Sequence, residues 1–383
     1  MPRLLYLLAL CNLVVGTGAF VLSGILQPVS DALGVSVASA GQAMTVYALS
    51  TAVLAPLALV FTGRWPRRNA LCLGLLVFAL GNLMCAFATS LGWLFAGRAL
   101  MGMGAVFTPL AAGIAVAAVE PVRRGRALSL VFLGMSLSYV IGVPLGAWLA
   151  FRFGWAWPFA LVAAMSLLGA VTLALVLPKN MAAPGASFAG LPALLRQSAV
   201  WWTLSLTLLY FMAIFTVFSY IGPVLQALYP MSHERMSATL VMFGLSGVVG
   251  TLIGGWANDR FGTRRTLTLQ LAVLGSMMLL VPLTRGHYAL LVTVFVVWGI
   301  AGFGMMTPQQ SRLATLAPAQ APLLFSLNTS MLYLGTALGA AAGGAFSAQL
   351  GMAHLPWIGA PLAALGLFTL WMSARKPLAL APT

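Results

Sequence analysis

The side chain with the strongest claim to chemistry is Arg98, a charged group inside an apolar stretch. Of the 19 Lys and Arg residues it alone lies in such a stretch, Leu94–Val119, and none of the four acidic residues does. An arginine at mid-membrane depth costs roughly 2.5–3.5 kcal/mol on insertion scales, so a chain keeps one there for a reason. Two compatible interpretations stay open. Arg98 donates its N–H groups to carbonyls and polar side chains of the first span, or it lies beside a ligand site.

The other groups that could do chemistry are few and scattered. The four acids are all expected at span ends or in breaks, and are Asp31, Glu120, Glu234 and Asp259. The cysteines show no paired spacing, and the three histidines fall in expected outer breaks. This pattern indicates neither a metal site nor a disulfide framework, and it predicts no cofactor. Without a cluster of carboxylate, histidine or cysteine side chains in the spans, an enzyme is not favoured.

The elements that hold Arg98 are predicted from composition. Hydrophobic residues make up 61% of the 383 residues and charged residues 6%, whereas soluble domains are about one quarter charged. A membrane-spanning helix needs about 20 apolar residues. We therefore predict an all-α integral membrane protein with twelve transmembrane helices. The expected spans are 4–27, 39–62, 70–90, 92–119, 127–151, 157–177, 199–226, 237–257, 266–284, 288–308, 320–346 and 356–374.

Basic residues are distributed unequally between the breaks, which alternate between the two sides of the membrane. Three lie on one side, Arg152, Arg235 and Arg285, and 15 lie on the other. The positive-inside rule assigns the richer side to the cytoplasm, so both termini are expected there, in a cell (inner) membrane. The net charge of +15 does not predict nucleic-acid binding, because the arginines form no continuous basic face.

Four sequence matches at nearly constant offsets indicate an internal repeat. We predict two six-helix bundles in parallel orientation, 1–177 and 199–374, with a cytoplasmic linker at 178–198 and a cytoplasmic tail at 375–383. The linker is a flexible connector or a regulatory binding segment. The matches are Gly63–Arg68 with Asp259–Arg265, Thr108-Pro109 with Thr307-Pro308, Gly142 and Gly146 with Gly339 and Gly343, and Gly154–Phe159 with Gly351–Trp357.

Two segments carry a resemblance to a known family. The fifth span reads Gly134-Met-Ser-Leu-Ser-Tyr-Val-Ile-Gly-Val-Pro-Leu-Gly, and the fourth contains Arg98-Ala-Leu-Met-Gly-Met-Gly. On these motifs the chain resembles the major facilitator superfamily, in its twelve-span drug:proton antiporter branch. Within that branch it is most similar to sugar-, nucleoside- and chloramphenicol-type efflux permeases. The resemblance covers essentially the whole chain and implies two pseudo-symmetric bundles with a central site. Under the second interpretation of Arg98, the resemblance implies that the arginine lies beside this central site.

The fifth span also has a physical explanation of its own. Gly134, Ser138, Gly142 and Gly146 recur every four residues and share one helix face. Small residues let helix backbones approach closely in lipid, and Pro144 removes a backbone hydrogen bond and permits a bend. The plain interpretation is a packing seam. The resemblance adds that Gly142, Pro144 and Gly146 bend during alternating access.

A second gating element is implied by the resemblance, in the break between the eighth and ninth spans. In this family an acid pairs with arginines there as a cytoplasmic latch, and we expect Asp259 to pair with an arginine of the loop at 122–126. The first-half copy has Gly63 and Pro66 in place of the acid and the glycine, so its arginines are expected only to fix topology. The second-half copy keeps Asp259, Arg260, Gly262 and Arg265.

Proton coupling and substrate class depend on a missing acid. Relatives often carry one in the first span, where this chain has Gly18 and Ala19, which leaves Asp31 as the proton-coupling candidate. A site with one arginine and no carboxylate repels cations, so neutral or anionic organic molecules fit better. Each candidate substrate contact has helix packing as its alternative. The candidates are Asn12, Thr17, Phe20, Gln42, Tyr47, Tyr139, Tyr210, Tyr220, Trp298, Asn328 and Tyr333.

The leading hypothesis is a monomeric secondary efflux transporter, coupled to protons by antiport and embedded in the lipid bilayer. Its expected partners are a small-molecule substrate and protons, without nucleic acid. One alternative is proton-independent facilitation or uptake, which the missing carboxylate keeps open. The other is a non-transporting membrane sensor on the same fold, against which the short breaks argue.

Overall fold

The computed structural model of the chain is helical throughout the residues that it describes, which are 3–62, 65–120, 124–178, 191–317 and 321–375. Within these ranges, 12 segments are long and apolar enough to cross a membrane. This confirms the predicted fold class. The helices are apolar over most of their length because backbone groups in a bilayer must be bonded internally, and a helix achieves this within one segment.

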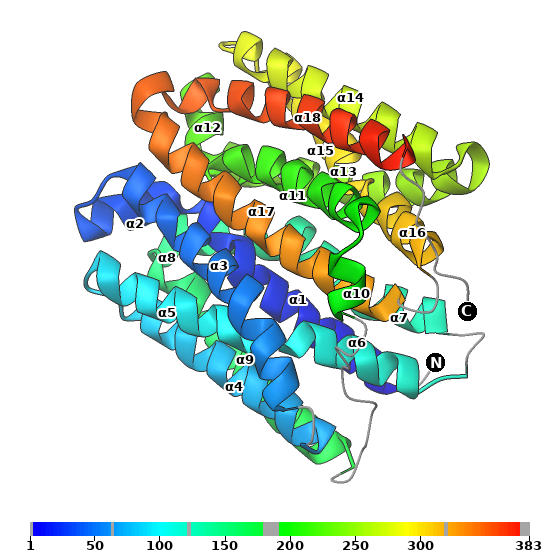
Figure 1. The fold of residues 1–383 in the computed structure, drawn as a ribbon. Helices are drawn as coiled ribbons and strands as arrows, with labels where there is room; N and C mark the ends of the chain where they lie inside the picture. The colour runs from blue at the N-terminus through cyan, green and yellow to red at the C-terminus, as the bar shows by residue number, and fades with distance from the viewer. Residues whose placement is uncertain (1–2, 63–64, 121–123, 179–190, 318–320, 376–383) are drawn as a thin grey trace. The chain divides into compact units, whose positions relative to one another are not determined.

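In the first half of the chain, spans two, five and six pack mainly against spans one, three and four (Figure 1). Span one contacts spans five and six, span three contacts spans four and six, and span two contacts span four. The helices are α1 (Arg3–Gly24), α2 (Leu26–Leu33), α3 (Val37–Phe61), α4 (Arg67–Ala86), α5 (Leu91–Gly104), α6 (Phe107–Ala117), α7 (Arg124–Leu137), a π-helical turn η2 (Ser138–Gly142), α8 (Val143–Phe153) and α9 (Ala156–Val176).

The last six spans repeat this pattern of neighbours. Span seven contacts spans eleven and twelve, and span nine contacts spans ten and twelve. The helices are α10 (Leu191–Leu195), α11 (Ser198–Phe218), α12 (Ile221–Leu228), α13 (His233–Phe261), α14 (Thr263–Leu280), η3 (Val281–Thr284), α15 (Tyr288–Phe303), α16 (Met306–Leu316), α17 (Ala321–Leu350), η5 (Met352–His354) and α18 (Pro356–Arg375).

Four spans are interrupted, and they form two equivalent pairs. Span four divides into α5 and α6 and span ten into α15 and α16, with both breaks at the same repeat position, 199 residues apart. Pro109 and Pro308 follow these breaks, and a proline cannot supply the N–H that would bond across them. Span one divides into α1 and α2 and span seven into α11 and α12, at breaks that also correspond. Helices broken at corresponding positions of two repeats are typical of transporter binding sites.

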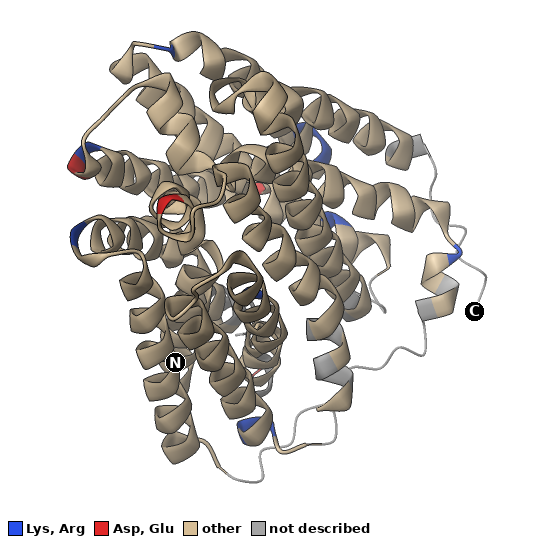
Figure 2. Cartoon of the chain, turned by 90° about the vertical axis from the view of Figure 1, so that its left-hand side faces the viewer, with Lys and Arg blue, Asp and Glu red and all other residues tan. Residues whose placement is uncertain are grey.

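Helices continue past the apolar windows and carry basic residues at their ends. We expected Arg312 in the break that follows a tenth span at 288–308, and this was wrong, because α16 continues to Leu316. Gln309 and Gln310 sustain a helix well although they end the apolar window. Figure 2 shows Lys and Arg mainly towards helix ends, with long uncharged stretches between them.

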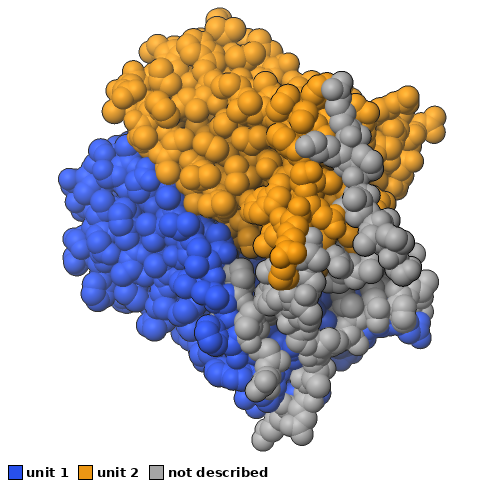
Figure 3. Space-filling view, viewed as in Figure 1, with its two compact units in different colours: residues 1–186, 219–223, 231–244 blue, residues 187–218, 224–230, 245–383 orange. Residues whose placement is uncertain are grey.

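The chain divides into two compact units (Figure 3). Unit 1 comprises 1–186 together with 219–223 and 231–244, and unit 2 comprises 187–218, 224–230 and 245–383. The breakpoint of span seven and the first part of α13 therefore belong to unit 1, although both follow the linker in sequence. The bundle bounds 1–177 and 199–374 remain predictions.

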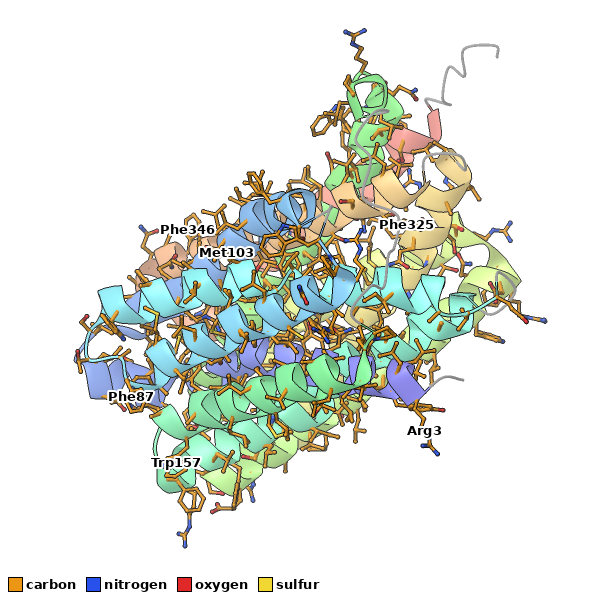
Figure 4. All side chains as sticks on the ribbon, turned by 90° about the horizontal axis from the view of Figure 1, so that it is seen from below. Arg3, Phe87, Met103, Trp157, Phe325 and Phe346 are labelled. Carbon is orange, nitrogen blue, oxygen red and sulfur yellow. The ribbon has the colours of Figure 1, made fainter. Side chains whose placement is uncertain are left out.

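Large apolar side chains cover the outside of the helices. Phe87 is 76% exposed and Trp157 57% exposed, and both project away from the ribbon in Figure 4. Exposed apolar area of this kind is unfavourable in water and favourable against lipid tails.

Candidate functional site

Arg98 lies on α5 with its side chain fully buried, and backbone carbonyls of two other spans hold its guanidinium. Nη1 donates to the Gly18 carbonyl at 2.8 Å and Nη2 to the Ala19 carbonyl at 2.8 Å. Nε donates to the Ala43 carbonyl at 3.2 Å. All four acids of the chain are exposed, so the charge of this buried arginine is met by dipoles and not by a carboxylate.

Two sulfur atoms and an aromatic ring complete the shell around Arg98. Nη2 lies 3.2 Å from Met44 Sδ and Nη1 lies 4.0 Å from Met101 Sδ. The guanidinium carbon lies 4.6 Å from the centre of the Tyr47 ring, whose negative face attracts a cation. Three carbonyls and two weakly accepting sulfurs therefore match the five N–H donors of the side chain. In this arrangement every N–H group of Arg98 faces a protein acceptor. An effect of Arg98 on a ligand, which stays a prediction, would act through the electric field of its charge.

A buried amide joins spans one, four and five, and we call this group the first junction. Asn12 Nδ2 donates to the Val131 carbonyl at 3.1 Å, and Thr108 Oγ1 donates to Asn12 Oδ1 at 2.8 Å. The Asn12 side chain is fully buried. It is therefore bonded within helix packing, although the sequence pointed to it as a substrate contact.

The corresponding group in the other half joins spans seven, ten and eleven, and we call it the second junction. Gln309 Nε2 donates to the Thr203 carbonyl at 2.7 Å and to Thr207 Oγ1 at 2.9 Å. Thr207 Oγ1 donates in turn to Asn328 Oδ1 at 2.5 Å. All four residues are buried, and Asn328 follows Val131 by the repeat offset of 197.

The sequence pointed to Asn12 and Asn328 but missed their hydroxyl and amide partners. Thr108, Thr207 and Gln309 are polar residues in apolar spans. Their signal was their position: Thr108 precedes Pro109 and Gln309 follows Pro308, at the breaks of the interrupted spans.

The small residues of span five pack against span one, as the seam interpretation describes. A Cβ atom at Gly142 would meet Thr17 Oγ1, and one at Gly146 would meet Val21. The π-helical turn η2 lies directly before Pro144, and the unbonded carbonyl that a proline leaves allows the helix to widen there. Whether this turn bends during a transport cycle stays a prediction.

Aromatic and polar candidates also pair within unit 1. The Phe20 and Tyr139 rings stack with centres 4.9 Å apart, on either side of the seam between spans one and five. Gln42 Nε2 donates to Tyr220 Oη at 3.3 Å, and Thr45 Oγ1 donates to Gln42 Oε1 at 3.0 Å. Both pairs therefore bring predicted contacts together from different spans.

The remaining candidates belong to unit 2 or to α2. Tyr210, Trp298 and Tyr333 belong to unit 2, where Tyr210 and Trp298 are almost fully buried. Asp31 is exposed on α2, where its Oδ1 accepts from Gln27 Nε2 at 2.8 Å. Substrate contact for the aromatic residues and proton coupling through Asp31 remain predictions.

The loop motif of the second half lies at the turn between α13 and α14. Gly262 has φ of +79°, a left-handed conformation that favours glycine, and this explains why the turn keeps one. Asp259 Oδ1 accepts from Asn258 Nδ2 at 3.3 Å. Asp259, Arg260 and Arg265 are exposed. The expected partner of Asp259, in the loop at 122–126, falls on side chains outside the described part of the chain.

The arrangement of twelve spans, with its repeated neighbours and paired breaks, can be compared with known proteins. The sequence profile described as Major Facilitator Superfamily matches residues 8–321 and 240–383. The chain belongs to the Major Facilitator Superfamily. It is therefore a multi-pass membrane transporter and not an enzyme.

Relatives in the Major Facilitator Superfamily match the chain over nearly its whole length. The inner membrane transport protein YdhP of Escherichia coli (strain K12) is 34% identical, with 94% of this chain and 93% of the relative covered. A probable sugar efflux transporter of Mannheimia succiniciproducens is 26% identical, with 94% and 91% covered.

A solved structure shares the superfamily fold. The inward-facing, occupied form of a bacterial homologue of the human lysosomal transporter Spinster superposes with a TM-score of 0.83. The superposition covers 99% of this chain and 98% of the homologue's chain, at 16% sequence identity. A similarity at this low identity shows the fold alone.

Proposed function

We propose that this protein is a secondary transporter that exports small neutral or anionic organic compounds, of drug, sugar or nucleoside type, by alternating access. The similarity to the Mannheimia protein, which is named a probable sugar efflux transporter, supports export. The inner-membrane name of YdhP and the 15-to-3 distribution of basic residues support a place in the inner membrane with both termini in the cytoplasm. The protein acts as a monomer, with 178–198 as a cytoplasmic linker.

The substrate class rests on the carboxylate-free shell of Arg98. Its guanidinium is fully buried and bonded to neutral carbonyls, and no acid of the chain is buried. At an effective dielectric constant of about 20, unit charges 4 Å apart interact by about 4 kcal/mol, so an uncompensated positive charge repels nearby cations strongly. Lipophilic cations are therefore excluded, and neutral or anionic molecules are favoured.

Proton antiport is the proposed mode of coupling, with Asp31 as the proton-coupling carboxylate. Its exposure on α2 gives protons access from water. The residues assigned to gating are Arg98, the seam residues Gly142, Pro144 and Gly146, and the loop residues Asp259, Arg260, Gly262 and Arg265.

Proton-independent facilitation is a second candidate mode, and one observation favours it. A coupling carboxylate commonly lies within the membrane, where burial tunes its pKa. Asp31, Glu120, Glu234 and Asp259 are all exposed. The chain therefore lacks the buried acid that most directly links proton and substrate movement.

Counterflow and pH-jump assays in proteoliposomes test the substrate class and separate the two modes. The panel contains a sugar, a nucleoside, a phenicol-type drug and an organic anion, with a lipophilic cation as the matched negative control. We expect flux of at least one neutral or anionic compound, no flux of the cation, and proton movement opposite to substrate. Flux of substrate without proton movement would exclude antiport and would leave facilitation as the mode of transport. Transport of the cation alone would overturn the substrate class.

A further inference from the structure

Arg312 is a partly buried arginine that the transport proposal does not use. It lies on α16, and its Nη2 donates to Ser373 Oγ on α18. Its Nη1 is buried and has no hydrogen-bond partner among the described residues. A buried donor on a charged group carries a large desolvation cost when it is unpaired. This nitrogen is therefore suited to a ligand with strong acceptor oxygens.

A second guanidinium acts on the same place. The positive charge of Arg264, in the first turn of α14, interacts unfavourably with that of Arg312. Neither arginine forms an ion pair with a described residue, and the acid nearest in sequence, Asp259, accepts from Asn258. Two neighbouring like charges that no described acid pairs with attract an anion.

Hydrogen bonds at the base of α14 connect the helices that carry the two arginines. Thr263 Oγ1, next to Arg264, donates to Asn258 Oδ1 at 2.9 Å. Asn258 Nδ2 lies 3.4 Å from Ser311 Oγ, next to Arg312. One amide thus connects the beginning of α14 to α16, so the backbones that carry Arg264 and Arg312 are held near each other.

The first half of the chain shows that this arrangement is not a requirement of the fold. Arg68 precedes Arg264 by the repeat offset of 196, and its Nη1 donates to the Ala174 carbonyl at 3.2 Å. The position 199 residues before Arg312 is Gly113, which carries no side chain. At these two repeat positions the first half therefore has one arginine, which donates to a carbonyl. The second half has two arginines, and one N–H donor of Arg312 is not used.

We propose that Arg264 and Arg312 bind a phosphate group, supplied by the headgroup of an anionic phospholipid. Guanidinium groups match phosphate oxygens in geometry and charge, and arginines at span ends lie at headgroup depth. Exposed apolar side chains suited to the acyl chains lie on α14, which carries Arg264, and on α18, which carries the Ser373 partner of Arg312. Leu269 of α14 is 65% exposed, and Phe368 and Trp371 of α18 are 49% and 40% exposed.

The test measures lipid retained by the purified full-length protein, using phosphatidylglycerol and phosphatidylcholine with identical acyl chains. The wild type is expected to retain more phosphatidylglycerol. Since an arginine near the surface contributes about 1 kcal/mol to binding of anionic lipid, Arg264→Gln and Arg312→Gln should each lower retention at least about fivefold. Native mass spectrometry gives the retained lipid, and phosphatidylcholine retention should stay unchanged.

Arg68→Gln is the matched control, because it removes an arginine from the equivalent turn without touching the pair. Equal retention in wild type, Arg264→Gln and Arg312→Gln overturns the proposal, as does an equal loss in Arg68→Gln. Arg264 is exposed, so its variant carries the test if Arg312→Gln does not fold. Inorganic phosphate distinguishes a lipid headgroup from a soluble phosphate as the source of the group. If added phosphate stabilises the protein in phosphatidylcholine alone, and both variants lose this stabilisation, the same site binds a soluble phosphate.

Discussion

The first and second junctions connect equivalent spans, but with different chemistry. Asn12 alone supplies the amide that ties spans one, four and five, whereas Gln309, Thr207 and Asn328 form a chain of bonds through spans seven, ten and eleven. The first half adds Arg98, and the position 199 residues later is Val297, next to the buried Trp298. One half is thus held by a charge and one amide, and the other by a neutral network.

This difference separates what the fold needs from what is particular to one half. Polar bonds at the breaks of spans four and ten occur in both halves, so they belong to packing of the interrupted helices. At the repeat position of Arg98 a fully buried charge occurs in one half only, and the other half has the apolar Val297 there. The asymmetry therefore makes Arg98, and not the amides, the first residue to test for function.

Arg98→Ala is expected to have the largest effect. It removes three bonds to carbonyls and a fully buried charge, so transport should be abolished while the protein still inserts. The free energy of unfolding should fall by about 1–3 kcal/mol, because buried carbonyl acceptors lose their donor. Arg98→Lys should not restore full flux, because an ammonium lacks the planar fork that reaches three carbonyls.

Proteoliposome flux and thermal unfolding of the same preparations measure both effects. The matched variant in the other half is Val297→Ala, which should keep most of its flux. Normal flux in Arg98→Ala would reduce the arginine to a packing role and remove the functional asymmetry between the halves.

The twelve spans could be predicted from the sequence because hydropathy and span length are properties of the chain alone. The breaks in spans one, four, seven and ten could not, since an interrupted helix stays apolar across its break. The Thr-Pro repeats marked two of these breaks without identifying them as such. Gln309 was missed for a related reason: the predicted tenth span stopped at 308, one residue before it.

Only part of the group around Arg98 could be predicted from the sequence. Gly18 and Ala19 drew attention because relatives often carry an acid there, and these residues supply the two shortest bonds to the arginine. Their contribution is a carbonyl oxygen, which every residue type has, so no side-chain pattern could reveal it. The sequence also could not show that Asn12 and Asn328 are buried in helix packing. A polar residue in an apolar span looks the same in sequence whether it lies in a packing seam or in a substrate pathway.

The glycine seams should respond next most strongly, and differently in the two halves. A Cβ at Gly339 would meet the Met212 carbonyl, which is backbone, whereas one at the equivalent Gly142 would meet the Thr17 hydroxyl, which is a side chain. Overpacking costs about 1–3 kcal/mol, so both alanine variants should lose stability. Adding Thr17→Ala should recover most of the loss in Gly142→Ala, and no single side-chain truncation should recover Gly339→Ala.

Thermal unfolding of the single and double variants decides this point, with Gly92→Ala as the control, because a Cβ there meets no atom within 4 Å. If Thr17→Ala fails to relieve Gly142→Ala, the contact with span one does not limit that glycine. The two seams would then be equivalent.

A smaller effect is expected from the neutral network of the second junction. Hydrogen bonds between membrane helices contribute about 0.6 kcal/mol on average and up to about 1.7 kcal/mol. Gln309→Leu removes two of them, so it should lower the free energy of unfolding by about 1–2 kcal/mol while flux persists. A double-mutant cycle with Thr207→Val should give a coupling energy within the range for one bond. Zero coupling, or loss of flux as complete as in Arg98→Ala, would contradict a purely structural second junction.

The smallest expected effect lies at the break of span seven, where the halves differ again. Tyr220 Oη accepts from Gln42 Nε2 at 3.3 Å, while the corresponding residue of span one, 195 positions earlier, is the apolar Ile25. Tyr220→Phe keeps the ring that fills the space over Gly41 and removes one long hydrogen bond, so stability should fall by only about 0.5 kcal/mol. Gly41→Ala, whose Cβ would meet that ring, should cost more. A drop in flux with Tyr220→Phe alone, at unchanged stability, would assign the hydroxyl to substrate and place a polar contact at one break that the other break lacks.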